Sequence, residues 1–223
     1  MKYSADGLVR FDEAKHTYWK GDKRLIGVTS LIKKYTEPFD AHAQAIKYCK
    51  KHGGDPYELM AKWEQKGFDS RVAGSAAHKV LEDYCDTGEI TFMPNPPMKQ
   101  VAAVKFIIDK FKTGRLIPKC WECLVHFNNT ASMIDLVADT PNGDTYILDY
   151  KTSKEISKDG WGRYMKYPFE QLPDANFYHY SLQCSIYKKM FGGEIKDAYI
   201  VHIKETGYDL IKTEDIFVPD WIL

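Results

Sequence analysis

Long hydrophobic runs, net charge and cysteine are all scarce in this sequence of 223 residues. No stretch approaches the roughly 18 apolar residues that cross a membrane as a helix, which argues against a membrane-spanning protein. The N-terminus lacks a basic region followed by an apolar one, so the sequence indicates no secretory signal. We therefore expect a soluble, cytoplasmic protein with no membrane partner.

The charges cancel, because the sequence holds 31 basic and 31 acidic residues. The protein then has no overall field that attracts nucleic acid, and any polyanion site must be local. One local excess lies at residues 151–167, which carry five positive charges against two negative ones. The overlapping segment from Thr152 to Gln171 has no clear periodicity and is predicted to be a long basic and aromatic loop.

The five cysteines are an odd number and are dispersed along the chain. A chain of this size needs no disulfides to fold, so the pattern predicts reduced thiols. Cys120 and Cys123 form a Cys-x-x-Cys pair with no second pair after it. We interpret them as buried structural thiols rather than as a metal or redox site.

The order of the predicted elements indicates an α/β protein of one domain, residues 1–223. Residues 1–68 are predicted to form a small β-hairpin or meander followed by helices. Residues 69–223 are predicted to form the core, with a helix from about Asp69 to Asp86, another ending at Gly114, and a late helix beginning at Asp174. The predicted strands of this core are Cys120 to Phe127, Met133 to Ala138, Thr145 to Tyr150, Ala198 to Lys204 and Tyr208 to Lys212.

The N-terminal part holds two predicted helices rich in lysine and aromatic residues. Asp40 is expected to cap the first, and Asp55 to cap the second, which should end at Gly67. Lysines interleaved with aromatics suit a path for single-stranded nucleic acid, because bases stack on rings and phosphates pair with ammonium groups. Ordinary amphipathic helices with aromatic core anchors are the alternative. The residues concerned are Lys47, Lys50, Lys51, Lys62, Lys66, Tyr48, Tyr57 and Trp63.

Two acidic residues stand in strongly apolar strands. Asp135 is flanked by Ile134 and Leu136. Burying an aspartate there is unfavourable in free energy unless its carboxylate binds another group. Asp149 and Lys151 project from the same face of the next strand, because side chains alternate along a strand. A carboxylate and an ammonium at the end of an apolar strand are expected to meet a metal and a phosphate.

The acidic-any-Lys pattern alone proves little, since it occurs four times in the chain. The copies are Glu13/Lys15, Glu64/Lys66, Asp149/Lys151 and Glu194/Lys196. The context of the third copy distinguishes it. A helix before it carries His78 and Glu82 four residues apart, hence on one face, and a helix after it carries Gln183 and Tyr187 with the same spacing.

The ordered set of motifs resembles the PD-(D/E)XK nuclease superfamily, and in particular its RecB-like exonuclease branch. That branch includes phage recombination exonucleases and the mitochondrial genome maintenance exonuclease. The resemblance spans residues 74–187, roughly half of the chain. Matching stretches are Gly74-Ser-Ala-Ala-His78-Lys-Val-Leu-Glu82, Ile134-Asp135-Leu-Val, Ile147-Leu-Asp149-Tyr-Lys151-Thr and Gln183-Cys-Ser-Ile-Tyr187.

The resemblance implies a restriction-endonuclease-like core, a central mixed β-sheet flanked by helices. It also implies a Mg²⁺-dependent or Mn²⁺-dependent deoxyribonuclease that acts on DNA ends or single strands in recombination, repair or replication. DNA is then the substrate, a recombination or replication protein is an expected partner, and a phage origin would place the protein in the host cytoplasm.

The resemblance also assigns residue roles. Asp135, Asp149 and Lys151 are the predicted catalytic residues, with Lys151 orienting or deprotonating the attacking water. The predicted metal ligands are His78, Asp135, Asp149 and the Tyr150 carbonyl. Gln183, Tyr187 and Lys154 are expected to contact the DNA. Glu82 and Glu122 are candidates for supporting the ligands or holding a second metal.

Two departures from the family pattern stand out. Ser132 occupies the position two before Ile134, where the family often has glycine. Some relatives bind an iron–sulfur cluster through one early and three late cysteines, but the last cysteine here is Cys184, so we expect no such cluster. Two other functions remain open at this stage. One is a structure-specific or restriction-type endonuclease with the same site, and the other is an inactive nucleic-acid-binding protein with this fold.

Overall fold

The computed structural model describes residues 2–223, and it has the predicted α/β architecture. A mixed sheet of nine strands forms its centre, with the order β1-β2-β3-β4-β6-β7-β8-β9 and with β5 paired to β6. The strands are β1 (Lys2–Tyr3), β2 (Val9–Asp12), β3 (Thr17–Lys20), β4 (Lys23–Gly27), β5 (Ile117–Phe127), β6 (Thr130–Asp139), β7 (Thr145–Lys151), β8 (Asp197–Lys204) and β9 (Gly207–Lys212).

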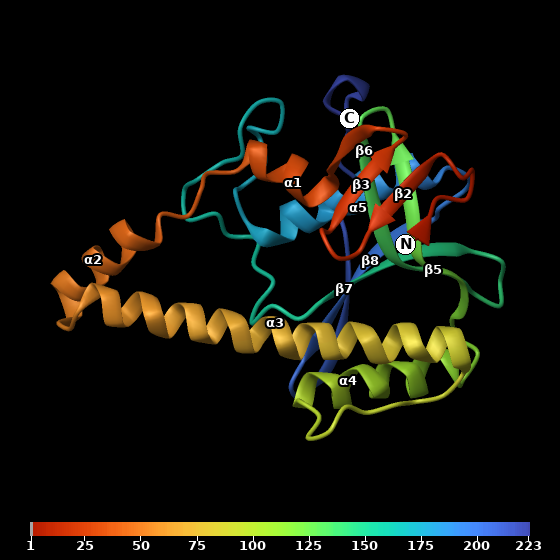
Figure 1. The fold of residues 1–223 in the computed structure, drawn as a ribbon, viewed down its shortest axis with the longest axis horizontal. Coiled ribbons are helices and arrows are strands. Elements are labelled where there is room, and N and C mark those ends of the chain that lie inside the picture. The colour runs from red at the N-terminus through yellow and green to blue at the C-terminus, as the bar shows by residue number, and fades with distance from the viewer. Residues whose placement is uncertain (1) are drawn as a thin grey trace.

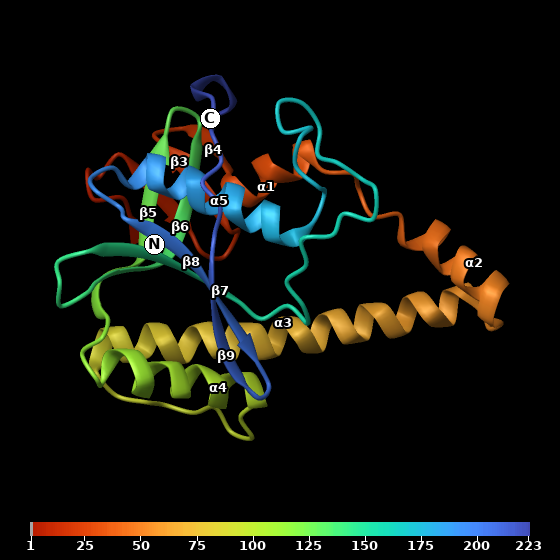
Figure 2. The same ribbon diagram turned by 180° about the vertical axis from the view of Figure 1, so that it is seen from behind.

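Helices cover both faces of this sheet (Figures 1 and 2). The main helices are α1 (Val28–Ile32), α2 (Ala41–His52), α3 (Pro56–Thr87), α4 (Met98–Phe106) and α5 (Asn176–Phe191). Short helical segments are η1 (Lys33–Tyr35), the π-helix η2 (Ile107–Phe111) and η3 (Asp220–Ile222). None of the helices in residues 2–223 combines the length and apolar character needed to span a membrane.

Side-chain alternation along β7 divides the core into two layers. Ile147 points into the cluster beneath α1 and α5, whereas Leu148 and Tyr150 point into the cluster beneath α3 and α4. Asp149 and Lys151 therefore lie on the α5 side, as the sequence predicts. The predicted meander of β5, β6 and β7 is confirmed, because both pairs are antiparallel. β8 then returns parallel to β7.

The helix expected to end at Gly67 instead continues as one helix, α3, through Pro56–Thr87. A glycine inside a helix is unfavourable by only about 1 kcal/mol, which neighbouring turns can offset. A side-chain hydrogen bond also stabilises the helix at Gly67, since Gln65 Nε2 donates to Asp69 Oδ1 at 2.9 Å across the glycine. The division expected after residue 68 thus falls within a continuous helix. Gly88 ends the helix in the left-handed conformation, as expected.

Helix starts follow the predictions in part. Asp40 caps α2 by accepting from the Ala43 N–H at 2.9 Å, and Asp55 caps α3. Asp174 was expected to begin the late helix but does not cap α5, which begins at Asn176. Instead its carboxylate accepts from Glu37 N at 3.0 Å and lies 2.7 Å from His179 Nε2.

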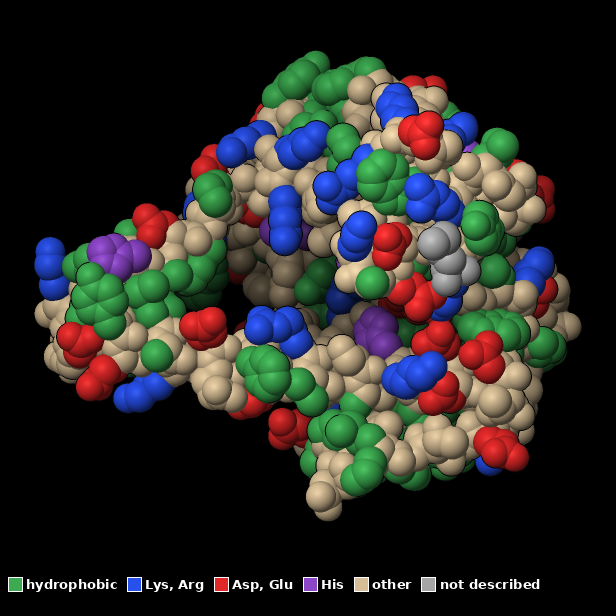
Figure 3. Space-filling model, viewed as in Figure 1, with side chains coloured by type: hydrophobic (Ala, Val, Ile, Leu, Met, Phe, Trp, Pro, Cys, Tyr) green, Lys and Arg blue, Asp and Glu red, His purple; other side chains and the backbone are tan. Residues whose placement is uncertain are grey.

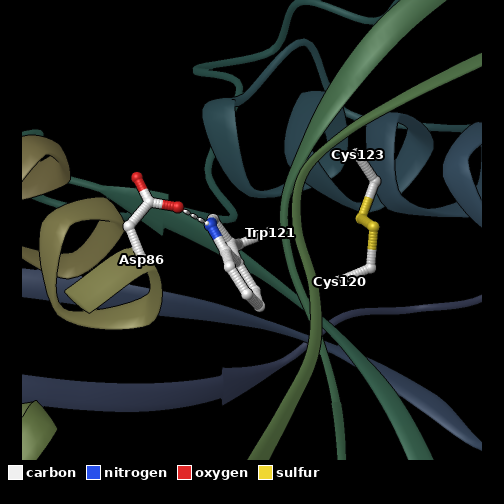
Figure 4. Close-up of a disulfide and its surroundings, with 4 residues drawn as sticks. All are labelled: Asp86, Cys120, Trp121 and Cys123. Atoms are coloured by element: carbon white, nitrogen blue, oxygen red, sulfur yellow. Dashed lines mark hydrogen bonds between the residues drawn. A yellow bond between two sulfur atoms is a disulfide. The ribbon is translucent and has the colours of Figure 1, made fainter. Parts of the chain in front are cut away.

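The prediction of two reduced thiols at Cys120 and Cys123 is wrong, because the structure joins them in a disulfide (Figure 4). Both lie on β5, three residues apart, where the left-handed backbone of Glu122 brings the two side chains to one side. Between them, Trp121 Nε1 donates to Asp86 Oδ1 at 2.6 Å and ties β5 to the end of α3. Spacing alone could not reveal this local turn of the strand. The other three cysteines are free thiols.

Candidate functional site

The predicted site lies where β6 changes its strand neighbour. β5 follows one edge of β6 along its length, so β4 and β7 share the other edge. β4 pairs there only up to Ala131, and β7 pairs only from Leu136 onwards. Residues 132–135 between them pair with neither strand on that edge. We call this opening the fork, and Asp135 stands at its β7 side.

Asp135 replaces the missing backbone pairing with its side chain. Its Oδ2 accepts a hydrogen bond from the Tyr150 N–H at 2.7 Å, which holds the carboxylate beside β7. Burial raises the pKa of Asp135 to about 7, and the nearby Asp149 charge adds to this shift. The carboxylate of Asp135, buried beside that of Asp149, forms a site that favours an additional positive charge.

Asp149 and Lys151 form a buried ion pair at the end of β7. The Lys151 ammonium contacts Asp149 Oδ2, and Asp149 is only 1% exposed. Burial alone would lower the pKa of Lys151, but the charges of Asp149 and Asp135 raise it above its ordinary value. Lys151 is therefore a cation here, which suits orienting a water or a phosphate better than accepting a proton.

Gln183 and Tyr187 lie on α5 directly beneath Asp149. Gln183 Nε2 donates to Asp149 Oδ1 at 3.2 Å and also to the Tyr187 hydroxyl. Ser132, in the fork, donates to the same hydroxyl at 3.2 Å. Gln183 is 8% and Tyr187 2% exposed, so in this structure they hold Asp149 rather than present groups to solvent. The role of Ser132 in holding Asp149 through Tyr187 was not predicted from the sequence.

His78 reaches the fork from α3. Its Nε2 lies 3.1 Å from the Tyr150 carbonyl oxygen, and its Nδ1 lies 3.9 Å from Asp135 Oδ1. Burial of its inner edge lowers the pKa of His78, and the Lys151 charge adds to this, so the imidazole is held neutral. Gly74, one turn earlier, lets α3 lie close to the chain just after β7, because a Cβ there would meet Thr152 Oγ1 at 2.8 Å.

Glu82 and Glu122 meet on the outer side of Asp135. Lys2 lies between them, with its ammonium 3.1 Å from Glu82 Oε1 and 3.5 Å from Glu122 Oε2. Burial raises the pKa of Glu122, and repulsion from Asp135 adds to the shift. No sequence pattern pointed to Lys2, because the contact depends on β1 joining the sheet 80 residues before Glu82 along the chain.

The donor types fit a hard divalent cation. Carboxylate and carbonyl oxygens are the ligands that Mg²⁺ prefers, and adjacent ligands of an octahedral Mg²⁺ lie about 3 Å apart, given bonds of about 2.1 Å. In this structure, His78 Nε2 donates a hydrogen bond to the Tyr150 carbonyl oxygen at 3.1 Å, a contact that both atoms would give up to bind a cation. These donors do not yet surround a cation position in this structure. Within residues 2–223 no three His, Cys, Asp or Glu side chains converge closely enough to hold a metal. Lys151 would also have to release Asp149 Oδ2 before that oxygen could bind a cation.

The second predicted feature, the lysine and aromatic path, forms an arm. α2 and the first half of α3 project from the body, and Figure 3 shows a hollow between arm and body with Lys and Arg side chains at its margin. Tyr57 is 71% and Tyr48 49% exposed, so these rings are not buried core anchors. Phe39 faces Trp63 with ring centroids 6.2 Å apart, a contact that the sequence did not suggest. Lys154 is exposed on the loop after β7.

No protein-family model matches this chain, and no curated protein matches it. Among solved structures, the one described as "Crystal structure of SSO0001" is similar with a TM-score of 0.36 and 15% sequence identity. The similar region covers 88% of this chain and 70% of that chain.

Proposed function

We propose that this protein is a metal-dependent deoxyribonuclease of the PD-(D/E)XK superfamily, RecB-like branch, that degrades DNA from ends or along single strands. One observation carries the proposal. The fork brings Asp135, Asp149 and Lys151 of two successive strands together with His78 of a helix much earlier in the chain. Crowded carboxylates beside a fixed lysine cation are suited to holding a divalent ion and a phosphate.

In the proposed reaction, Asp135, Asp149, the Tyr150 carbonyl and His78 would hold Mg²⁺ or Mn²⁺. A bound divalent ion would lower the pKa of a water ligand and stabilise charge on the phosphate. Gln183 fixes the rotamer of Asp149 through its hydrogen bond at 3.2 Å. Lys151, held as a cation, places positive charge against the phosphate oxygens as negative charge develops on them.

The arm and the basic loop supply the proposed DNA path. The exposed rings of Tyr48 and Tyr57 can stack with bases, which contributes about 1–3 kcal/mol per base. Lys154 stands three residues after Lys151, in position to meet the phosphate backbone as it leaves the fork. Trp161 on the same loop is 81% exposed and adds a further stacking surface. The tight burial of Tyr187 gives it a role in supporting Asp149 rather than in touching DNA.

The proposal is tested by digestion of end-labelled linear DNA, with Mg²⁺ and with chelator. The wild type should release nucleotides only with the metal, while Asp149→Ala and Lys151→Ala should release none although they remain folded. Lys119→Ala is the matched control, because Lys119 pairs with Asp139 on the surface at 3.4 Å. Nucleotide release by Asp149→Ala at the wild-type rate would refute the proposal.

One observation favours a second function, an inactive nucleic-acid-binding protein. Lys151 contacts the Asp149 oxygen that a metal would need, so the pair could replace a cation permanently. Calorimetric titration with Mn²⁺ separates the two functions. Binding that disappears in Asp135→Asn supports the nuclease, whereas the absence of any Mn²⁺ binding in the wild type supports the inactive protein.

A further inference from the structure

A second pocket lies at the other end of β7 from Lys151. It has a volume of about 210 Å³ and opens between the end of the α4–η2 helix and the sheet. Leu116 and Leu148 form its apolar floor, and the rings of Tyr146 and Tyr199 form its wall. Tyr146 stands five positions before Lys151, or roughly 16 Å along a strand at about 3.3 Å per residue. The pocket is thus separate from the fork.

Two cations stand at this pocket, Lys110 and Arg115. The π-helix η2 carries Lys110, and the Leu116 N–H donates to the Lys110 carbonyl at 3.0 Å, which folds the following turn back so that Arg115 lies alongside. Such π-helical turns occur frequently at functional sites. Among residues 2–223, neither cationic side chain has an ion pair or hydrogen-bond partner.

The carboxylates around the pocket are already engaged by other groups. Asp144, next to the pocket, pairs with Lys196 at 2.6 Å, and Asp197 pairs with Lys212 at 2.7 Å. Asp109, on η2, accepts from the Tyr208 hydroxyl at 3.2 Å. Within residues 2–223 no carboxylate forms an ion pair with either pocket cation, although Asp109 keeps its negative charge while it accepts from Tyr208.

The two tyrosines give the pocket an aromatic wall. The ring centroids of Tyr146 and Tyr199 are 5.6 Å apart in an edge-on arrangement with an interplanar angle of 67°. An apolar floor, an aromatic wall and two free cations are complementary to a ligand with one flat ring system and one anionic group. Pockets for drug-sized ligands measure about 300–1,000 Å³, so a space of about 210 Å³ admits a single ring system with the remainder of the ligand in solvent.

We infer that this pocket binds one nucleotide, with the base against Tyr146 and Tyr199 and the phosphate between Lys110 and Arg115. Base stacking on aromatic rings supplies about 1–3 kcal/mol. The guanidinium of Arg115 can hold two phosphate oxygens at once, and Lys110 adds a point charge. The inference does not depend on the proposed nuclease activity, because no residue of the fork takes part.

The test is calorimetric titration of the full chain in chelator, which prevents hydrolysis. The probes are deoxyadenosine 5′-monophosphate, deoxyadenosine and inorganic phosphate. The nucleotide should bind at least tenfold more tightly than either fragment. The double variant Lys110→Ala/Arg115→Ala should lose at least tenfold in nucleotide affinity, while Lys112→Ala, which changes an exposed lysine of the same segment, should bind like the wild type. Tyr199→Leu should reduce nucleotide affinity towards that of phosphate alone.

Three results would overturn the inference. Equal affinity for phosphate and nucleotide would show a simple anion site, and unchanged affinity in the double variant would place the nucleotide elsewhere. Loss of binding in Asp149→Ala but not in the double variant would place the nucleotide in the fork.

A nuclear magnetic resonance titration of the unaltered protein adds a direct measurement. The nucleotide should shift the ring-proton resonances of Tyr146 and Tyr199. Titration with a 5′-phosphorylated tetranucleotide then distinguishes two natural ligands, the end of a DNA strand and a free nucleotide. If the tetranucleotide binds more tightly than the mononucleotide, the pocket binds strand ends. If the two bind equally, the pocket binds free nucleotides.

Discussion

The ion pair between Lys151 and Asp149 sets the chemistry of the fork. Asp149 is almost fully buried, and its two oxygens contact Lys151 and Gln183. A buried carboxylate that keeps its charge needs such partners, and removal of one partner is far more damaging than replacement of both. The pair therefore affects the stability of the protein as well as its proposed activity.

Lys151→Met should destabilise the metal-free protein by about 3 kcal/mol, because it leaves the Asp149 charge buried without a cation. The double variant Asp149→Asn/Lys151→Met should be more stable than Lys151→Met alone, since no charge then remains to be paired. Urea unfolding in chelator measures both values. Equal stability of the single and double variants would show that Asp149 does not depend on Lys151.

Asp135 should make the metal-free protein less stable as pH rises. Its pKa in the folded protein is about 7, above the ordinary value of 3.8, so the folded state binds more protons than the unfolded state between these values. The free energy of unfolding should therefore fall from about pH 4 to about pH 7 and then level off. Asp135→Asn, which cannot ionise, should lack this part of the slope.

The measurement is urea unfolding in chelator at several pH values, with wild type and Asp135→Asn side by side. Asp22→Asn is a control outside the fork, since Asp22 is exposed in the turn between β3 and β4. An identical slope in Asp135→Asn and wild type would contradict the expectation.

At the scale of elements, α3 connects the arm to the fork, and two of its glycines have different roles. A Cβ at Gly67 would meet only the end of the Arg71 side chain at 3.4 Å, whereas a Cβ at Gly74 would meet Thr152 Oγ1 at 2.8 Å. Gly67 stands on the exposed arm, where nothing requires a glycine. Gly74 permits the close approach of α3 that brings His78 to Tyr150.

Gly67→Ala should stabilise the protein by roughly 0.5–1 kcal/mol, since alanine favours a helix interior over glycine by this amount. Gly74→Ala should destabilise it, because the gain in helix propensity is smaller than the steric conflict with Thr152. Thermal or urea unfolding measures both. The double variant Gly74→Ala/Thr152→Ala, which removes the conflicting hydroxyl, should recover stability, and a failure to do so would assign the loss to another contact.

At the scale of the whole molecule, the arm and the body together border the hollow seen in Figure 3. The arm buries little of its surface, since Ala45 is the one buried residue of α2. A projecting helical arm with exposed rings has no evident value for stability. In the proposed function, a DNA strand lies along this exposed surface.

Tyr48→Ala/Tyr57→Ala should weaken binding of a labelled single-stranded oligonucleotide by roughly tenfold or more, because each lost stacking contact is worth about 1–3 kcal/mol. Fluorescence anisotropy in chelator measures the affinity. Phe217→Ala is the matched control, because Phe217 is 84% exposed but lies near the C-terminus, away from the arm. Equal weakening by the control would show that exposed rings anywhere bind DNA without specificity.

Parallel digestion of closed circular DNA and linear DNA tests whether the protein is an exonuclease or an endonuclease. An exonuclease needs an end, so the wild type with Mg²⁺ should degrade linear DNA and leave closed circles intact. Cutting of the circles at a comparable rate would favour the structure-specific or restriction-type endonuclease. A chelator control should stop both reactions.

Sequence alone was sufficient for most of the elements, because they follow from local rules. Alternation of apolar residues determined the strands, and Asp40, Asp55 and Gly88 marked helix ends through backbone hydrogen bonds and left-handed turns. The placement of Asp149 and Lys151 on one face followed from the two-residue period of a strand. These inferences needed only neighbours along the chain.

Only the tertiary structure decided the rest, because it depends on contacts between distant segments. The fork exists because β4 and β7 share one edge of β6, and that sharing gives Asp135 its bond to Tyr150. The Lys2 contact with Glu82 and the second pocket likewise arise between segments that are distant in sequence. A local pattern cannot specify them, since the burial and charge that define them come from residues far away in sequence.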